Sequence, residues 1–153
     1  MEWTTLTEDD VLSGMTQKER DDFAKISVGV TVTDRIIPIM ANLVAEIRGY
    51  ITTWSPNTIS ADLTKIPPSM KAQAVALARG RVLTTIPGYQ MGKSREKEFD
   101  AATTYFRDVA KGTIRPEPAD DAVVTATPSE KPAGVQIVSG PGSRTGRTRM
   151  DGI

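Results

Sequence analysis

Cysteine and histidine are both missing from this chain of 153 residues. Without cysteine, the chain has neither a disulfide framework nor a thiol nucleophile. Without histidine, it lacks the commonest general base and the commonest transition-metal ligand. An enzyme is therefore the least favoured class, because no motif gathers carboxylates, lysine or serine into a site. We expect no catalytic residue, no cofactor and no metal.

The chain also has no excess of charge of either sign, since 19 lysines and arginines match 19 aspartates and glutamates. No overall electrostatic field therefore draws it to nucleic acid or to an anionic membrane. Apolar runs long enough to span a membrane are absent, and the first residues are acidic and resemble no signal peptide. We expect a soluble protein of the cytoplasm with one domain and a modest core.

The most informative stretch is residues 33–54, where large apolar residues recur with helical spacing. They are Ile36, Met40, Leu43, Val44, Ile47, Ile51 and Trp54. The pattern predicts one long helix with a wide buried face and with polar residues, Arg48 among them, on the opposite face. We expect Thr33 to cap this helix and Asp34 to favour its first turn. Pro38 predicts a first turn that is kinked or irregular.

Four further helices are expected around this long one. Thr7 and Thr16 each precede an acidic residue by three positions, which is the spacing of a capping box. Pro67 and Pro68 suit the start of a helix, and Gly112 suits the end of one. The expected ranges are 8–13, 17–25, 69–85 and 94–111, with an extended link at 27–32. The sequence therefore predicts an all-α antiparallel helical bundle in residues 1–114, with two short N-terminal helices and three longer ones.

Residues 115–153 have a different composition, rich in proline and glycine and without an aromatic residue. Such a segment buries too little apolar surface to offset its ordering entropy. We expect an extended or disordered arm that contains a candidate β-strand for pairing with another chain, and near its end an acid-poor arginine cluster for a protein or nucleic-acid contact. The candidate assembly interface is Val135, Gln136, Ile137, Val138, Arg144, Arg147 and Arg149.

Residues 87–94 end in Gly-Lys-Ser at the start of the last helix, like the end of a phosphate-binding P-loop. Pro87 stands where that motif needs glycine, and a helix precedes the loop instead of a strand. We interpret the stretch as an interhelical loop. The basic residues Lys93, Arg95 and Lys97 open the last helix, and two interpretations carry equal weight: a patch that faces DNA, or ordinary solubilising charge.

Four segments carry a resemblance to a known family: AEIRGYI in the long helix, IPPSMKAQAVALARGRVL, EFDAATTYFRDVAKGTI, and the terminal RTRMDGI. Their order resembles that of the head-tail connector, or head-completion, proteins of tailed bacteriophages. The likeness is strongest to the Mu-like prophage adaptor group and looser to the gp6-like and gp15-like adaptors. Glu46, Ile47 and Tyr50 match an acid, an aliphatic and a tyrosine common in that long helix, and Phe106 to Gly112 match its aromatic, lysine-glycine helix end.

The resemblance implies a virion structural protein of the neck. During assembly the protein is in the host cytoplasm, and in the virion it forms a dodecameric ring beneath the portal protein. Such a ring extends the channel through which DNA passes without sequence-specific binding, and it docks a tail or neck protein. By analogy, Lys93, Arg95 and Lys97 face the channel or the portal. The alternative is a small helical nucleic-acid-binding regulator, against which the balanced charge counts.

Overall fold

The computed structural model describes residues 1–27, 29–54 and 57–123. Within these ranges it is mostly helical, and the expected all-α helical bundle is confirmed. A short 3₁₀ helix, Pro68–Met70, leads into the fourth α-helix. The α-helices are α1 Glu8–Ser13, α2 Gln17–Ile26, α3 Val32–Thr53, α4 Lys71–Thr84 and α5 Lys93–Ala110.

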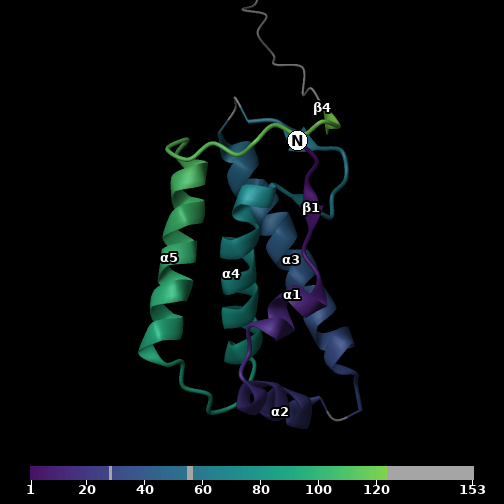
Figure 1. Cartoon of the computed structure of the whole chain (residues 1–153), viewed down its shortest axis with the longest axis vertical. Helices are drawn as coiled ribbons and strands as arrows, with labels where there is room; N and C mark the ends of the chain where they lie inside the picture. The colour runs from purple at the N-terminus through teal and green to yellow at the C-terminus, as the bar shows by residue number, and fades with distance from the viewer. Residues whose placement is uncertain (28, 55–56, 124–153) are drawn as a thin grey trace, which may run out of the picture.

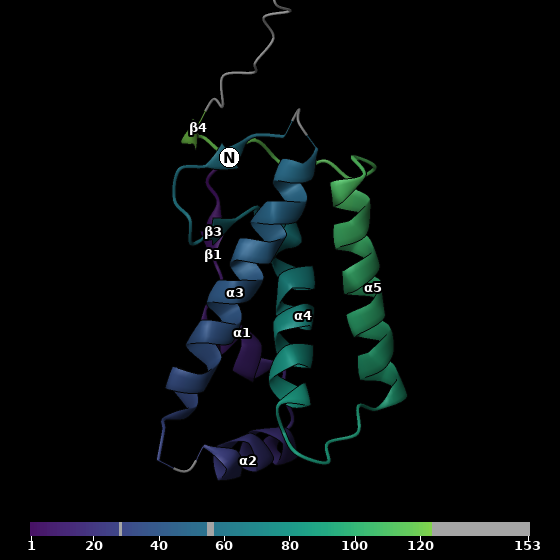
Figure 2. The same ribbon diagram turned by 180° about the vertical axis from the view of Figure 1, so that it is seen from behind.

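The three long helices form a layer in which neighbours run in opposite directions (Figure 1). α4 lies between α3 and α5, and α2 crosses the end of the bundle where α3 and α5 begin (Figure 2). α1 packs against α3 and α4. The order along the chain therefore places α2 and the loop between α4 and α5 at one end, and both ends of residues 1–123 at the other.

The starts of the first three helices follow one local rule. α1 and α2 begin with the expected capping boxes at Thr7 and Thr16. α3 begins with a third box, in which the Thr31 hydroxyl accepts a hydrogen bond from the Asp34 amide at 3.1 Å. The expected cap, Thr33, is wrong, because Thr31 has the same spacing to an acid as the other two caps and satisfies the free amides first. The Thr33 hydroxyl instead donates to Glu8 at 3.0 Å.

The start of α3 also differs from the expectation of an extended link at 27–32 and an irregular first turn. Ser27 caps α2, and Val32 is already helical. The helix continues through Pro38, whose side chain is exposed. The carbonyl that loses its partner, that of Asp34, belongs to an exposed residue, so water can satisfy it.

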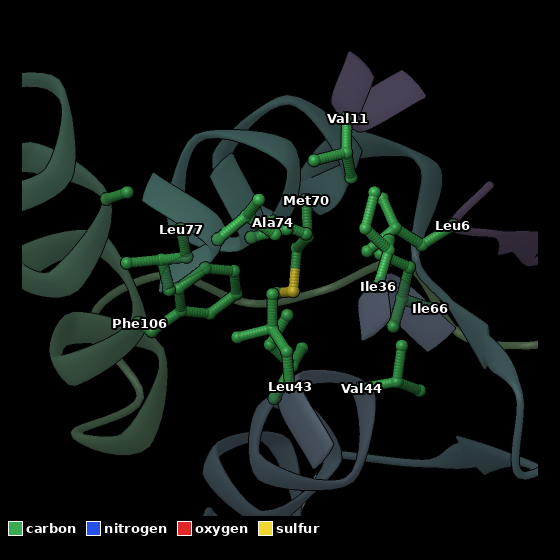
Figure 3. Packing of buried hydrophobic residues seen from close by; sticks show 14 of the residues in the cluster. Leu6, Val11, Ile36, Leu43, Val44, Ile66, Met70, Ala74, Leu77 and Phe106 are labelled. Carbon is green, nitrogen blue, oxygen red and sulfur yellow. The ribbon is translucent and has the colours of Figure 1, made fainter. Parts of the chain in front are cut away.

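The core lies where α3, α4 and α5 meet, and it extends under α1 (Figure 3). The predicted face of α3 is confirmed at Ile36, Leu43, Ile47 and Ile51, which are fully buried. α4 contributes small side chains beside larger ones, which brings the helices close together. The labelled core residues in Figure 3 are Leu6, Val11, Ile36, Leu43, Val44, Ile66, Met70, Ala74, Leu77 and Phe106.

Arg48 corrects the prediction for the opposite face of α3, because its side chain is only 6% exposed. Nη1 donates to the carbonyls of Asp62 and Lys65 at 2.9 and 3.0 Å. Nη2 donates to the carbonyl of Ser60 at 2.7 Å. The guanidinium also lies 5.8 Å from the centre of the Trp3 ring, a cation–π distance. A polar residue on the helix thus organises the connector between α3 and α4.

Two short antiparallel sheets, which the sequence did not predict, close this end of the bundle. β1 Thr4–Thr5 pairs with β3 Lys65–Ile66. β2 Ile59–Ser60 pairs with β4 Ala122–Val123. Each strand is only two residues long, so composition gave little signal for it.

The first residues of the expected arm contact the bundle. Residues 115–123 pack on the bundle, with Ala119 buried. The Trp3 indole donates to the Glu117 carbonyl at 3.1 Å, and the Ser69 hydroxyl donates to the Glu117 carboxylate. Contacts with the bundle therefore continue beyond Ile114. Hydrogen bonds from the backbone and side chains hold these residues, which have few large apolar side chains to bury. The remainder of the arm lies outside the described residues.

Replacing Ile47 by Ala should lower the free energy of unfolding by about 2–5 kcal/mol, because it removes a fully buried side chain at the α3 face of the core. Urea denaturation followed by circular dichroism measures this change. Asn42→Ala, on the exposed side of the same helix, is the matched control and should change stability by less than about 0.5 kcal/mol. An equal effect of both variants would contradict the assigned face.

Replacing Arg48 by Met should lower the free energy of unfolding by at least about 3 kcal/mol, because three backbone carbonyls lose a charged donor. The free energy of unfolding of Arg48→Lys should lie between those of Arg48→Met and the native protein, since one ammonium cannot reproduce the planar fork of donors. The same urea titration compares the three proteins. A lysine variant as stable as the native protein would show that charge alone, without the fork geometry, holds the connector.

Candidate interaction surfaces

Arg95, one of the three predicted channel-facing or portal-facing residues, is turned toward the protein. Its Nη2 donates to the Gly14 carbonyl at 2.7 Å and lies 3.3 Å from the Glu19 carboxylate. Its Nη1 lies 3.4 Å from the Glu98 carboxylate. These contacts join the start of α5 to the turn between α1 and α2. Arg95 therefore has a structural role that the sequence did not reveal.

Lys93 and Lys97, the other two predicted residues, are exposed on the first turns of α5. Gly92 is the N-cap of α5, and the chain reaches it from α4 through a loop. The structure thus separates the predicted trio into one inward arginine and two surface lysines. Only the lysines are placed to contact a partner.

A polar cluster surrounds Arg95 at this end of the bundle, and we call it the α2–α5 cluster. It comprises Glu19, Arg79, Tyr89, Arg95 and Glu98. Its members come from α2, α4, the following loop and α5. Residues as far apart in sequence as Glu19 and Arg95 have no local pattern that relates them, so sequence reasoning had no signal for the cluster.

Glu19 lies at the centre of this cluster and is only 9% exposed. Its carboxylate accepts hydrogen bonds from the Thr16 amide and the Tyr89 hydroxyl, each at 2.7 Å. Burial alone would raise the pKa of the Glu19 carboxyl, but these hydrogen bonds outweigh it and hold the pKa below its usual range. Burial and the neighbouring Glu19 carboxylate raise the pKa of Tyr89 to about 12.

A cavity of about 730 Å³ opens beside the cluster. Lys18 and Lys25 line it together with Asp22 and Glu19, so it carries both signs of charge. Within the described ranges, no three acidic residues come together as they would in a metal site. The cavity therefore offers no matched site for an anion or a cation.

A second, smaller cavity of about 230 Å³ lies along α3, and we call it the α3 groove. Its lining is apolar except for one threonine, and two of its side chains, Ile37 and Leu63, are 51% and 74% exposed. Sites for small molecules usually measure about 300–1,000 Å³. The groove is instead suited to a few side chains of a protein partner. It is lined by Leu6, Ile37, Met40, Ala41, Val44, Leu63 and Thr64.

Replacing Tyr89 by Phe should cost about 1.5 kcal/mol at neutral pH, because Glu19 loses a hydrogen bond to its charged group. The folded pKa of Tyr89 is raised, so its contribution is complete below pH 10 and is lost as the pH rises toward 12. The stability difference between the two proteins should therefore shrink over this interval. Urea titrations at several pH values measure it.

In a Glu19→Gln background, the same tyrosine substitution should cost less and should lose part of its pH dependence, since the charged acceptor is gone while burial still raises the pKa of Tyr89. If the stability difference between the native protein and Tyr89→Phe stays constant up to pH 12, the proposed coupling between Glu19 and Tyr89 is contradicted.

The candidate assembly residues of the arm, from Val135 to Val138 together with Arg144, Arg147 and Arg149, lie outside the described residues.

Among the helices that the structure describes, none has the length and apolar content needed to cross a membrane. Comparisons of the chain with family models, curated proteins and solved structures find no match.

Proposed function

We propose that the chain is a virion structural protein of a tailed bacteriophage, a non-enzymatic head-tail adaptor. In this role it assembles as a ring beneath the portal protein, extends the DNA channel and docks the tail or the next neck protein. One observation carries the proposal: four residues that carry the likeness to the adaptor group make contacts that join the three long helices or their ends. They are Glu46, Tyr50, Phe106 and Gly112.

The first of these contacts join α3 to its two neighbours. Glu46 forms an ion pair with Arg81 of α4 and accepts a hydrogen bond from the Tyr50 hydroxyl at 3.1 Å. The Tyr50 ring stacks on Phe106 of α5, with ring centres 6.2 Å apart. The acid, the tyrosine and the aromatic residue that carry the likeness thus share one junction.

The lysine-glycine end of α5 makes the next contact. Gly112 has a φ of 75°, in the left-handed region that favours glycine. A Cβ at this position would overlap the Trp54 indole, which caps α3. The family-like glycine therefore lets the ends of α3 and α5 close against each other. The contacts of Glu46, Tyr50, Phe106 and Gly112 give these family-like residues a packing role, which supports the likeness to a helical adaptor more strongly than an isolated match of letters.

The shape of the molecule is compatible with assembly into a ring. The α3 groove is apolar and open on one side of the helical layer, while Lys93 and Lys97 lie on the first turns of α5. A contact between two different surfaces of neighbouring copies closes into a ring when the rotation between copies permits it. In the proposed ring, which is dodecameric in the virion, the two lysines face the DNA channel or the portal.

The alternative function, nucleic-acid regulation, has less support. The exposed lysines of α5 alternate with the exposed acids Glu96 and Asp100. A regulator needs a compact basic surface with a strong field, and this helix start does not provide one.

The test is co-sedimentation of the purified full chain with portal-containing capsids of the same phage, over a range of salt concentrations. The chain should pellet with these capsids and should stay in the supernatant with capsids that lack the portal. Apolar contacts make such binding only weakly sensitive to salt, whereas DNA binding falls steeply as salt rises. Binding to DNA without binding to capsids would replace the adaptor with the regulator.

Replacing both Lys93 and Lys97 by Glu should reduce the capsid-bound fraction without changing the free energy of unfolding by more than about 0.5 kcal/mol, because both side chains are exposed. Lys111→Glu, at the opposite end of α5, is the matched control and should bind like the native chain. Equal binding by all three proteins would show that this end of α5 faces neither the portal nor a partner attached to it.

A further inference from the structure

The α3 groove has no occupant among the described residues, although its lining is almost wholly apolar and no charged side chain takes part. Exposed apolar surface is a common feature of contacts with other chains. Ile37 lies on one side of the groove as part of α3, and Leu63 lies on the other as part of the connector. The groove therefore needs an uncharged partner with aliphatic side chains.

The sequence beyond Val123 contains one segment with these properties. Val135, Ile137 and Val138 are aliphatic, Gln136 is uncharged, and no other stretch of residues 124–153 concentrates as many large aliphatic residues. In an extended chain, residues two apart point to the same side about 7 Å from each other. Val135 and Ile137 would then enter the groove together, and their size suits a cavity of about 230 Å³.

The described part of the chain ends at β4, which pairs with the connector that supplies Leu63 to the groove. β4 ends at Val123 and pairs with β2, which ends three residues before Leu63. In this antiparallel pair Ala122 lies opposite Ser60 and Val123 opposite Ile59, so the chain is heading away from Leu63. Its direction favours a groove on another copy over the groove of the same copy.

The distance is also sufficient. Twelve residue steps separate Val123 from Val135, and an extended chain of that length spans about 40 Å. The 22-residue helix α3 is about 33 Å long. The linking residues can therefore span more than the length of this helix, which is enough to reach a groove on a copy packed beside it.

We propose that the α3 groove of one copy binds residues 135–138 of a second copy. This inference rests on the proposed ring assembly and names the contact that links its subunits. Groove and segment are different surfaces, so each copy gives one contact and receives one, which is the arrangement a closed ring requires.

The absence of cysteine makes a direct test possible, because any disulfide must come from introduced residues. Full-length Leu63→Cys chains, marked by a short tag, are mixed with full-length Ser139→Cys chains under mild oxidation. Leu63 is 74% exposed, so its substitution should preserve the fold. We expect a disulfide-linked heterodimer of tagged and untagged chains, identified by mass. Adding Val135→Asp and Ile137→Asp to the untagged chain should abolish it.

Val30→Cys is the matched control for Leu63→Cys, because Val30 is also an exposed aliphatic residue, 46% accessible, but lies outside the groove. Its heterodimer should form more slowly and should not depend on Val135 and Ile137. Equal cross-linking at positions 30 and 63 would overturn the inference. A chain carrying both Leu63→Cys and Ser139→Cys tests the remaining possibility: a purely intramolecular disulfide would also overturn it.

This experiment contains no capsids, so its failure is distinguishable from failure of the proposed function. Specific cross-linking by a chain that ignores portal-containing capsids would support the contact and refute the adaptor. Capsid binding without specific cross-linking would retain the adaptor and refute the groove as the link between its copies.

Discussion

The guanidinium of Arg48 joins the C-terminal third of α3, the longest helix described, to the connector that follows it. Its three carbonyl acceptors belong to residues 60, 62 and 65, which include parts of β2 and β3. β3 pairs with β1, and β2 pairs with β4. The Trp3 ring beside the guanidinium donates its indole N–H to residue 117. The first residues, the connector and residues 115–123 therefore all depend on one side chain that bridges otherwise separate backbone groups.

The opposite end of the bundle is held by a different kind of chemistry. There Glu19 accepts a hydrogen bond from Tyr89 and faces Arg95, so α2 and α5 are joined by charge-assisted contacts. The apolar core between the two ends needs only helical periodicity and small side chains on α4. Both ends are closed by polar contacts, which leaves the side of α3 with the groove as the apolar surface available to a partner.

Sequence reasoning predicted the features that depend on short-range patterns. The stripe through Ile36, Leu43 and Ile47 identified the buried face of α3, and the threonine-acid spacing identified the starts of α1 and α2. The same spacing at Thr31 and Asp34 was present in the sequence and identifies the true start of α3. Sequence reasoning failed where contacts join distant parts of the chain. Helical periodicity assigns Arg48 to the polar face of α3, and nothing near Arg95 in the sequence indicates that its side chain turns inward. The groove escaped prediction for the same reason, because Leu63 approaches α3 only through the connector fold.

The pairing of β2 with β4 has a mechanical consequence. Residues beyond Val123 are attached to the bundle through this two-residue ladder and through the contacts of residues 115–121. A pull on the arm loads the β2–β4 hydrogen bonds first, and β2 passes the load through the Ser60 carbonyl to Arg48, in the C-terminal third of α3. Tension from a neighbouring molecule would thus reach the longest helix of the described residues, and would not simply peel the C-terminal end of α5 away from the layer.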